Sequence, residues 1–303
     1  MFSVIAFYKF VNLSPERVSE VRSFLEDFAA KSDLQGLVIL GKEGINSTLA
    51  ASDSTIQNFK TALKAQSEFE DVQFKNSSSE ESPFKRFKIK ERREIVTLKN
   101  EDHFADSRNN HISPEEWDKM MEDEDVVLID TRNDYEYEVG TFEGAINPDI
   151  QMFSEFPDYL ENSGIPKNKK VMIFCTGGIR CEKAIYEMQD QGYEQVYQLD
   201  GGILKYLEEK PNQKFKGDCF VFDNRVALNQ ELKPSDNIHL CAHCGDPGAL
   251  VVDCEECGKL AKICHRCAPQ PEFNTCSKNC AHHYLRKRAA VSNDSTGGNN
   301  DIS

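Results

Sequence analysis

The sequence has no long hydrophobic run, because none of its apolar stretches approaches the roughly 18 residues that a membrane-spanning helix needs. Residues Met1–Phe7 lack the basic start and the small-residue cleavage site of a secretory signal, so we expect no export. Basic residues are scarce, with 36 Lys and Arg against 51 Asp and Glu and a net charge of −15. These absences argue against a membrane protein and, at first sight, against binding of nucleic acid. We expect a cytoplasmic protein.

Fingerprints of organic cofactors are absent as well. No glycine-rich dinucleotide motif indicates flavin or nicotinamide, and no pair of histidines with a carboxylate indicates a mononuclear iron site. The 303 residues, 39% of them hydrophobic, suffice for two or three domains. Most of the eleven cysteines stand in closely spaced pairs, which without an export signal indicates bound metal rather than disulfides.

Residues Cys175–Arg180 form the strongest candidate for a catalytic loop. The apolar run 171–174 before the loop predicts a buried strand, and the spacing of apolar residues after Cys181 predicts a helix. A cysteine in this position faces backbone amides and the positive end of the helix, which lower the pKa of a thiol and stabilise anionic sulfur such as a persulfide. The alternative is an ordinary buried cysteine beside a Gly-Gly turn.

Four segments, in order, resemble a rhodanese domain: 126–132, 135–147, the Cys175 loop and 192–203. One departure is Thr141-Phe142, which stands where many members have His-Ile. The six-residue loop suits sulfur, whereas the related dual-specificity phosphatases carry one more residue, so a phosphatase is not expected. The resemblance implies that Cys175 is the nucleophile. We expect Arg180 and the loop amides to stabilise anionic sulfur or a nearby phosphate, and the Asp-x-Arg pair to support the loop. The supporting set is Arg180, Thr176, Gly177, Gly178, Ile179, Asp130 and Arg132.

Residues 1–100 predict a small α+β domain. Strand-like segments at 3–10, 37–40, 45–50 and 72–75 alternate with helices that begin at Ser14-Pro15 and near residue 53, and this β-α-β-β-α-β order is ferredoxin-like. The serine-rich segment 76–83 predicts a polar loop.

A basic strip follows, over residues 84–93. If it is a strand, alternation places Lys85, Phe87 and Ile89 on one face and Arg86, Lys88 and Lys90 on the other. Such a face meets RNA phosphates in one interpretation and is an ordinary solvated edge strand in the other, and the sequence favours neither. The candidate tRNA-binding residues are Lys85, Arg86, Lys88, Lys90, Arg92 and Arg93.

Four cysteine pairs lie near the C-terminal end, and their spacing lets both thiolates of a turn reach one tetrahedral ion. They predict two structural zinc sites, with ligands that pair either sequentially or in an interleaved order: Cys241, Cys244, Cys254, Cys257, Cys264, Cys267, Cys276 and Cys280. Any of the five histidines at 239, 243, 265, 282 and 283 could replace a thiolate as ligand, but we expect each of them at the surface. We therefore divide the chain into a ferredoxin-like domain (1–100), a linker with the first rhodanese helix (101–122), a rhodanese domain (123–215), a Cys-rich zinc-binding region (216–290) and a disordered tail (291–303).

The whole order resembles the bacterial tRNA uridine hydroxylase family. The resemblance is carried by Gly41–Asn46, by Cys175–Lys183 and by Gly217–Val226. It implies an acylphosphatase-like N-terminal domain, tRNA as partner and oxygen-dependent conversion of the wobble uridine to 5-hydroxyuridine. It also implies that Cys175 is the catalytic residue and a carrier of persulfide. The donor of electrons or sulfur is not indicated.

Two chemical routes stay open. The sulfur of Cys175 either attacks C6 of uracil and makes C5 nucleophilic, or itself cycles through oxidised forms. Cys181 either resolves an oxidised Cys175 or packs in the first turn of the helix. Two other functions compete: a plain thiosulfate-type sulfurtransferase, and a zinc-dependent RNA-binding adaptor that would be indifferent to Cys175→Ala.

Overall fold

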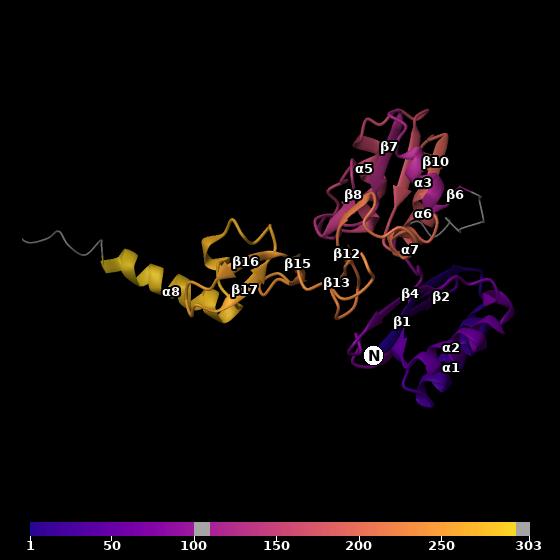
Figure 1. Ribbon diagram of the computed structural model, residues 1–303, viewed down its shortest axis with the longest axis horizontal. Coiled ribbons are helices and arrows are strands. Elements are labelled where there is room, and N and C mark those ends of the chain that lie inside the picture. Colours follow the sequence, from indigo (N-terminus) through magenta and orange to yellow (C-terminus); the bar gives the residue numbers. More distant parts are fainter. Residues whose placement is uncertain (100–109, 295–303) are drawn as a thin grey trace, which may run out of the picture. The chain divides into compact units, whose positions relative to one another are not determined.

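The computed structural model describes residues 1–99 and 110–294, and Figure 1 follows the chain by colour. The chain forms two compact units, Met1–Pro234 and Ser235–Ser303. Of the segments expected as a linker and as a disordered tail, residues 101–109 and 295–303 lie outside the described residues.

The first unit begins with a five-stranded sheet and two helices (Figure 1). Its elements are β1 (Phe2–Phe10), α1 (Pro15–Ala30), β2 (Gln35–Gly41), β3 (Gly44–Ala51), α2 (Asp53–Lys64), the short η1 (Ser67–Phe69), β4 (Lys75–Ser79) and β5 (Phe87–Glu91). The strand order is β4-β1-β3-β2-β5, and only β2 and β5 run parallel. This arrangement confirms the ferredoxin-like order predicted for the domain.

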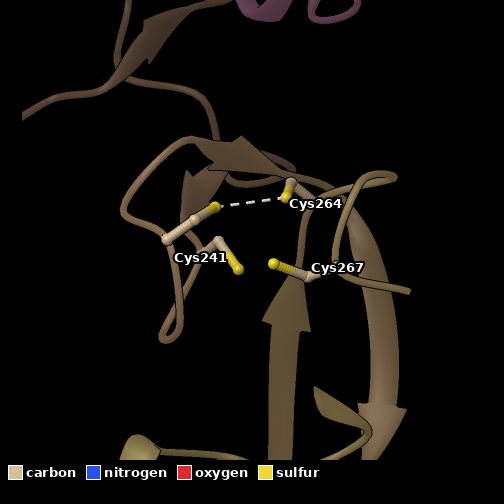
Figure 2. A group of neighbouring side chains, drawn as sticks. Cys241, Cys264 and Cys267 are labelled. Atoms are coloured by element: carbon tan, nitrogen blue, oxygen red, sulfur yellow. Dashed lines mark hydrogen bonds between the residues drawn. The ribbon is translucent and has the colours of Figure 1, made fainter. Parts of the chain in front are cut away.

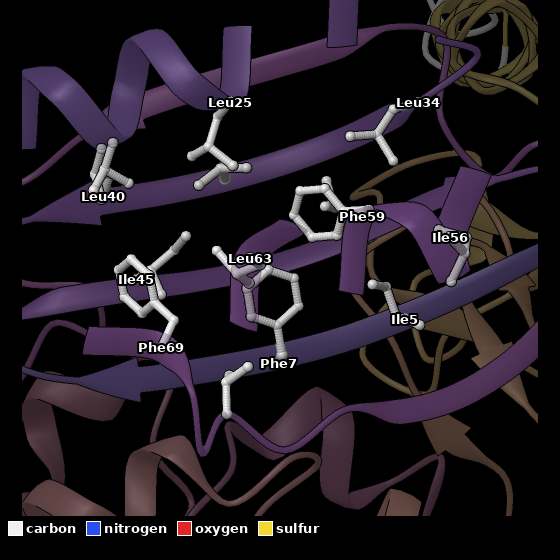
Figure 3. Packing of buried hydrophobic residues seen from close by; sticks show 14 of the residues in the cluster. Ile5, Phe7, Leu25, Leu34, Leu40, Ile45, Ile56, Phe59, Leu63 and Phe69 are labelled. Atoms are coloured by element: carbon white, nitrogen blue, oxygen red, sulfur yellow. The ribbon is translucent and has the colours of Figure 1, made fainter. Parts of the chain in front are cut away.

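Strand alternation gives this sheet two different faces. Ile5 and Phe7 of β1 point into one apolar layer together with Leu25 of α1 and Phe59 of α2 (Figure 3). The intervening residue Ala6 therefore points to the opposite face, where it packs against a second core that contains Phe142 and Phe174. The face away from the helices is thus turned toward the loop Cys175–Arg180.

The predicted bounds of the fourth strand, β4, were wrong. A strand was expected at 72–75 and a loop from 76, but β4 spans Lys75–Ser79 and pairs antiparallel with β1, with Lys75 opposite Ala6. The serine-rich segment has no hydrophobic alternation from which a strand could be predicted. Backbone hydrogen bonds to β1 hold it in the sheet instead.

The second part of the unit is an α/β layer structure. Its elements are β6 (His111–Ile112), α3 (Pro114–Met120), β7 (Val126–Asp130), α4 (Asp134–Tyr137), β8 (Gly140–Phe142), η2 (Phe153–Glu155), α5 (Phe156–Asn162), β9 (Lys170–Phe174), α6 (Ile179–Asp190), β10 (Gln195–Leu199) and α7 (Gly202–Glu209). The parallel strands have the order β6-β10-β9-β7. The strand β9 therefore lies inside the sheet, and Cys175 is the residue that follows it. The strand and the helix predicted on either side of the loop are confirmed as β9 and α6.

The same unit continues beyond residue 216, where we expected the Cys-rich region to begin. β11 (Phe215–Gly217) pairs with β8, and β12 (Cys219–Phe220) pairs with β13 (Ala227–Leu228). Cys219 is fully buried in the core that also contains Phe142 and Phe174. It belongs to neither cysteine cluster of the second unit.

The second unit is small and rich in turns. It contains β14 (His239–Leu240), β15 (Pro247–Gly248), β16 (Leu250–Asp253), β17 (Leu260–Ile263), η3 (Pro271–Phe273) and α8 (Lys278–Asp294). Its apolar core consists mainly of Ile263 and three cysteines. Across the part of the chain that the structure describes, no helix is long and apolar enough to cross a membrane.

Candidate active site and metal centres

The sulfur of Cys175 lies at the start of the predicted loop, fully buried at the end of β9. The backbone N–H of Gly178 donates to Sγ over 3.1 Å. Gly178 has a φ of +96°, and a Cβ there would lie 2.9 Å from the Tyr8 hydroxyl. Glycine is therefore required at this position both by the left-handed backbone and by the close approach of Tyr8.

The surroundings of Cys175 favour its thiolate. Burial alone would raise the pKa of the thiol, but a hydrogen bond from Cys181, the charge of Arg180 and backbone N–H groups of residues 180 and 181 lower it to about 5. Burial and the neighbouring thiolate raise the pKa of Cys181 well above its ordinary value, so Cys181 keeps its proton. The pair thus consists of one thiolate and one thiol that donates to it.

Arg180 is held by a residue that the sequence analysis did not select, Glu136 of α4. The guanidinium makes two hydrogen bonds to this buried carboxylate, of 2.5 and 2.8 Å, and Thr176 Oγ1 lies 3.3 Å from both side chains. Burial would raise the pKa of Glu136, but the charge of Arg180 lowers it below its usual range. Arg180 therefore acts on Cys175 through its field while its N–H donors are bound to Glu136.

Asp130 and Arg132 form a fully buried ion pair at 2.6 Å. Arg132 also donates to the carbonyl of Gly140, and Thr141 Oγ1 donates to Asp130 over 2.9 Å. Between them, Thr131 donates both its N–H and its hydroxyl to the carbonyl of Phe174. The pair fixes the start of β8, while Thr131 holds the strand end that precedes Cys175.

The first turn of α7 supports the loop from the other side. The N–H groups of Ile203 and Leu204 donate to the carbonyls of Cys175 and Thr176, both over 3.0 Å. Gly202 has a φ of +65°, and a Cβ there would lie 2.5 Å from the Cys175 carbonyl. The Gly-Gly turn thus allows the loop to rest directly on the helix.

Side chains of α6 contact the N-terminal sheet at two points. Tyr8 donates to Glu182 over 2.7 Å, and the fully buried Lys183 Nζ lies 2.9 Å from Glu43 and 2.7 Å from Glu94. Glu43 lies in the Gly41–Asn46 motif, whose role could not be read from the sequence. Through this contact the motif holds the helix that follows Cys175.

A cavity of about 660 Å³ opens between the loop and the sheet face that carries Ala6. The loop residues Cys175–Arg180 other than Gly178 line one side, and the segment Val221–Arg225 other than Asn224 lines another. Phe222 on that segment is 64% exposed and lies edge-on to Phe220, with ring centroids 5.0 Å apart. An aromatic surface and a thiolate therefore border the same space.

The basic strip lies at the edge of the sheet. Phe87 and Ile89 of β5 pack against the core, as the alternation predicted, while Lys88 is exposed and Lys90 half-buried. The flanking members Lys85, Arg86, Arg92 and Arg93 are exposed, and Arg92 also lines the cavity.

The eight predicted metal ligands form two groups with interleaved order. The first contains Cys241, Cys244, Cys264 and Cys267, and the second contains Cys254, Cys257, Cys276 and Cys280. Within each group all sulfur atoms lie within 4.8 Å of one another, and those of Cys241, Cys264 and Cys267 converge in Figure 2. Sulfur atoms about 2.3 Å from a tetrahedral zinc ion are spaced in this range, so both groups fit zinc.

The histidines take no part in these groups of described residues. His239, His265, His282 and His283 are exposed, as expected. The expectation was wrong for His243, which is buried, stacks on Phe273 with centroids 4.6 Å apart, and contacts the carbonyl of Thr275 through Nε2. Its ring links the two cysteine clusters from within the small core.

Comparison with known domain families divides the chain into three matches. Residues 2–95 match the UPF0176 acylphosphatase-like domain, residues 113–209 the rhodanese-like domain and residues 216–281 the rhodanese C-terminal domain. Among solved structures, the rhodanese-like domain of an Anabaena protein is 17% identical, with a TM-score of 0.31 over 36% of this chain and 80% of that one. A rhodanese-like protein of Staphylococcus aureus is 26% identical, with a TM-score of 0.28 over 32% of this chain and 90% of that one.

A curated protein of Bdellovibrio bacteriovorus called tRNA uridine(34) hydroxylase is 50% identical over 294 residues. The match covers 95% of this chain and 83% of the relative, and so includes both the loop and the cysteine clusters. The resemblance carried by the three sequence motifs is thereby confirmed, and the chain belongs to the tRNA uridine(34) hydroxylase family.

Proposed function

We propose that this protein hydroxylates C5 of the wobble uridine of tRNA to 5-hydroxyuridine, with Cys175 as the nucleophile. The observation that carries the proposal is the Cys175 thiolate at a cavity bordered by an exposed aromatic ring, in a chain half identical to a tRNA uridine(34) hydroxylase. The cavity is large enough for one extruded base, which an enzyme must reach outside the stack. We place the protein in the cytoplasm with its tRNA substrate.

Dioxygen is the co-substrate in this proposal. One oxygen atom enters the C5–H bond and the other leaves as water, so the reaction consumes two electrons and two protons from an external donor. In the first route the thiolate forms a bond to C6, and the C5–C6 π pair moves toward C5 and the C4 oxygen, which makes C5 reactive toward the oxidant. In the second route the sulfur of Cys175, as thiol or persulfide, is oxidised first.

The supporting residues act on the charge of the sulfur. The N–H of Gly178 donates a hydrogen bond to Sγ, and the thiol of Cys181 keeps its proton and stabilises the thiolate as a hydrogen-bond donor. Arg180 supplies a positive field while Glu136 fixes its orientation. The side chains of Asp130 and Arg132 bond to backbone groups, Asp130 to the N–H of Arg132 and Arg132 to the carbonyl of Gly140. We therefore assign them to positioning of the strand ends rather than to contact with substrate.

The tRNA backbone meets the basic strip on β5, in this proposal. Phosphate contacts are local, so a positive edge can bind RNA although the chain carries a net charge of −15. Two zinc ions held by the two cysteine groups keep the second unit folded, and we assign them no step in catalysis.

A sulfurtransferase is the second candidate, and one observation favours it. The six-residue loop stabilises anionic sulfur at Cys175, which is what a persulfide carrier needs. This function leaves the cavity wall formed by the N-terminal sheet and the basic strip without a role. A zinc-dependent adaptor explains the strip but leaves the thiolate without one.

The test is nucleoside mass spectrometry of tRNA from cells that lack the native enzyme, complemented with this protein or with Cys175→Ala. We expect 5-hydroxyuridine-derived nucleosides with the intact protein and their loss with Cys175→Ala. Cys219→Ala, which removes another buried thiol of the same unit, is the control and should keep the product. Absence of product with all three proteins, together with turnover of thiosulfate by the purified protein, would establish the sulfurtransferase instead. Product with Cys175→Ala would exclude Cys175 as the nucleophile.

A further inference from the structure

Lys75 is a buried lysine in the cavity wall that the residues discussed so far leave unused. It is 7% exposed and lines the same cavity as Cys175. Because β4 pairs with β1 in the register Lys75 to Ala6, its side chain leaves the sheet on the face turned toward the loop. The next residue of the same strand on that face, Ser77, also lines the cavity.

The other buried cations of the cavity are already paired. Arg180 bonds to Glu136, and Arg225 bonds to Asp223 at 2.6 Å. By contrast, no carboxylate in residues 1–99 and 110–294 lies within 4.0 Å of Lys75 Nζ, and no described group accepts a hydrogen bond from it. Its ammonium instead lies 4.4 Å from the centroid of the Tyr8 ring. Lys75 thus brings N–H donors into the cavity that the described protein groups leave unsatisfied.

Burial of the charged ammonium of Lys75 costs solvation free energy, and this cost lowers the pKa of the group. Burial lowers the pKa of Lys75 to about 8, against the attraction of Asp200, Cys175 and Glu182. The group therefore still carries its proton at neutral pH. A charged donor kept in a low-dielectric wall is best satisfied by a ligand that brings its own acceptor oxygen.

The rest of the wall indicates what kind of ligand this is. Val4, Leu37, Ile39 and Phe84 contribute apolar surface, and Phe222 contributes an exposed ring. The guanidinium groups of Arg180 and Arg225 also line the cavity, but both are already bonded to carboxylates. Beside Lys75 a flat ring with carbonyl oxygens therefore fits this wall better than a phosphate does. Uracil is a ring of this kind.

We propose that Lys75 is a catalytic residue that donates a hydrogen bond from its ammonium to the C4 carbonyl oxygen of the uracil ring held in this cavity, an inference that rests on the proposed function. The bond orients the base toward Cys175. When the sulfur adds to C6, the π electron pair moves toward the carbonyl oxygen, and the ammonium stabilises that charge. No proton, electron or further reagent has to enter for this step.

The test uses the full-length protein and two anticodon stem–loops, one with uridine at position 34 and one with an abasic site there. We expect the intact protein to bind the uridine stem–loop more tightly, and Lys75→Met to reduce this preference by roughly tenfold. Lys75→Arg keeps a charged donor and should retain part of the preference. In single-turnover assays, Lys75→Met should slow hydroxylation by about 100-fold.

Lys60→Met is the matched control, because Lys60 belongs to the same domain and its Nζ lies 5.4 Å from an aromatic ring, that of Phe74, but bonds to Asn76 on the helix-covered side. It should leave both the preference and the rate unchanged. The proposal is wrong if Lys75→Met keeps the preference for uridine, or if it weakens both stem–loops equally as a phosphate contact would. If the intact protein makes no 5-hydroxyuridine but its preference depends on Lys75, the proposed reaction fails and the base contact stands.

Discussion

At the scale of single residues, the site is organised around one negative charge. Cys175 is buried, which opposes ionisation, yet Cys181 and Arg180 both stabilise its thiolate. Cys219, buried in the same unit, shows the opposite behaviour, since burial raises the pKa of its thiol to about 12 although the charge of Arg132 opposes this shift. Burial alone therefore does not make a reactive cysteine, and the local donors decide.

This contrast predicts the pH dependence of the thiolate. The thiolate fraction rises as pH rises through the pKa, so a value lowered to about 5 means that Cys175 is ionised at neutral pH and becomes protonated only in acid. The measurement is the ultraviolet absorbance of thiolate during a pH titration of the intact protein, minus that of Cys175→Ala, which removes the contribution of the metal-binding cysteines. A midpoint near the ordinary value of 9 would contradict the assigned environment.

Several residues of the site could be predicted from the sequence because their chemistry depends on near neighbours. The strand, the glycines and the helix around Cys175 are contiguous, so hydrophobic periodicity and turn chemistry suffice. The eight cysteines of the two metal-binding groups could likewise be predicted as ligands from their spacing in pairs. Their interleaved pairing could not be predicted, since each spacing is compatible with either order.

Other site residues depend on contacts between distant parts of the chain. Lys183 contacts Glu43, which lies 140 positions earlier in the chain. Lys75 lines the cavity because of the register in which β4 pairs with β1, and the serines of β4 give no hydrophobic pattern from which that register could be predicted. Glu136 was visible only as one acidic residue among many. Such positions become recognisable when the fold has placed a charge in a buried site with a specific partner or with none.

At the scale of elements, β5 combines two roles in one short strand. Its apolar residues Phe87 and Ile89 complete the core, while the other face and the flanking residues carry positive charge. In our proposal only the second role bears on tRNA, so the two can be separated by mutation. Replacement of exposed charges leaves the packing of the strand intact.

We expect the triple variant Arg86→Gln, Lys88→Gln, Lys90→Gln to bind tRNA at least tenfold more weakly, with a slope of log affinity against log salt that is smaller by roughly 2. The control changes the same net charge elsewhere, through Lys119→Gln, Lys169→Gln and Lys233→Gln, whose lysines are all paired with acidic residues. Fluorescence anisotropy over a salt series measures both. Equal slopes for the two triple variants would show that β5 does not contact phosphates.

At the scale of the whole molecule, three matched domains form two compact units. The segment Val221–Arg225 shows why the first unit extends to Pro234. Arg225 donates to Ser77 Oγ over 2.7 Å, and the N–H of Asn224 donates to the carbonyl of Pro83, so the segment is tied to the N-terminal domain. The cavity wall therefore draws on all three matched regions, and a rhodanese domain alone would lack most of it.

The second unit depends on a different source of stability. Its buried apolar core is small. The cysteine pairs of the two groups alternate along the chain, so the two pairs that bind one metal ion lie on either side of a pair that binds the other. A structural zinc ion contributes about 10–16 kcal/mol to folding, far more than such a core. Both ions should thus hold one cooperative structure.

Removal of zinc by a chelator should therefore unfold the second unit and leave the first intact. We expect elemental analysis to give two zinc ions per chain. After chelation, hydrogen exchange should speed up at the amides of Gly245 and Gly258, which donate to the carbonyls of Cys241 and Cys254 in the metal-binding turns. The amides of Ile203 and Leu204, bonded to the carbonyls of Cys175 and Thr176, serve as the internal control and should stay protected. Retained protection at Gly245 and Gly258 would show that the turns fold without metal, and lost protection at Ile203 would show that the units are not independent.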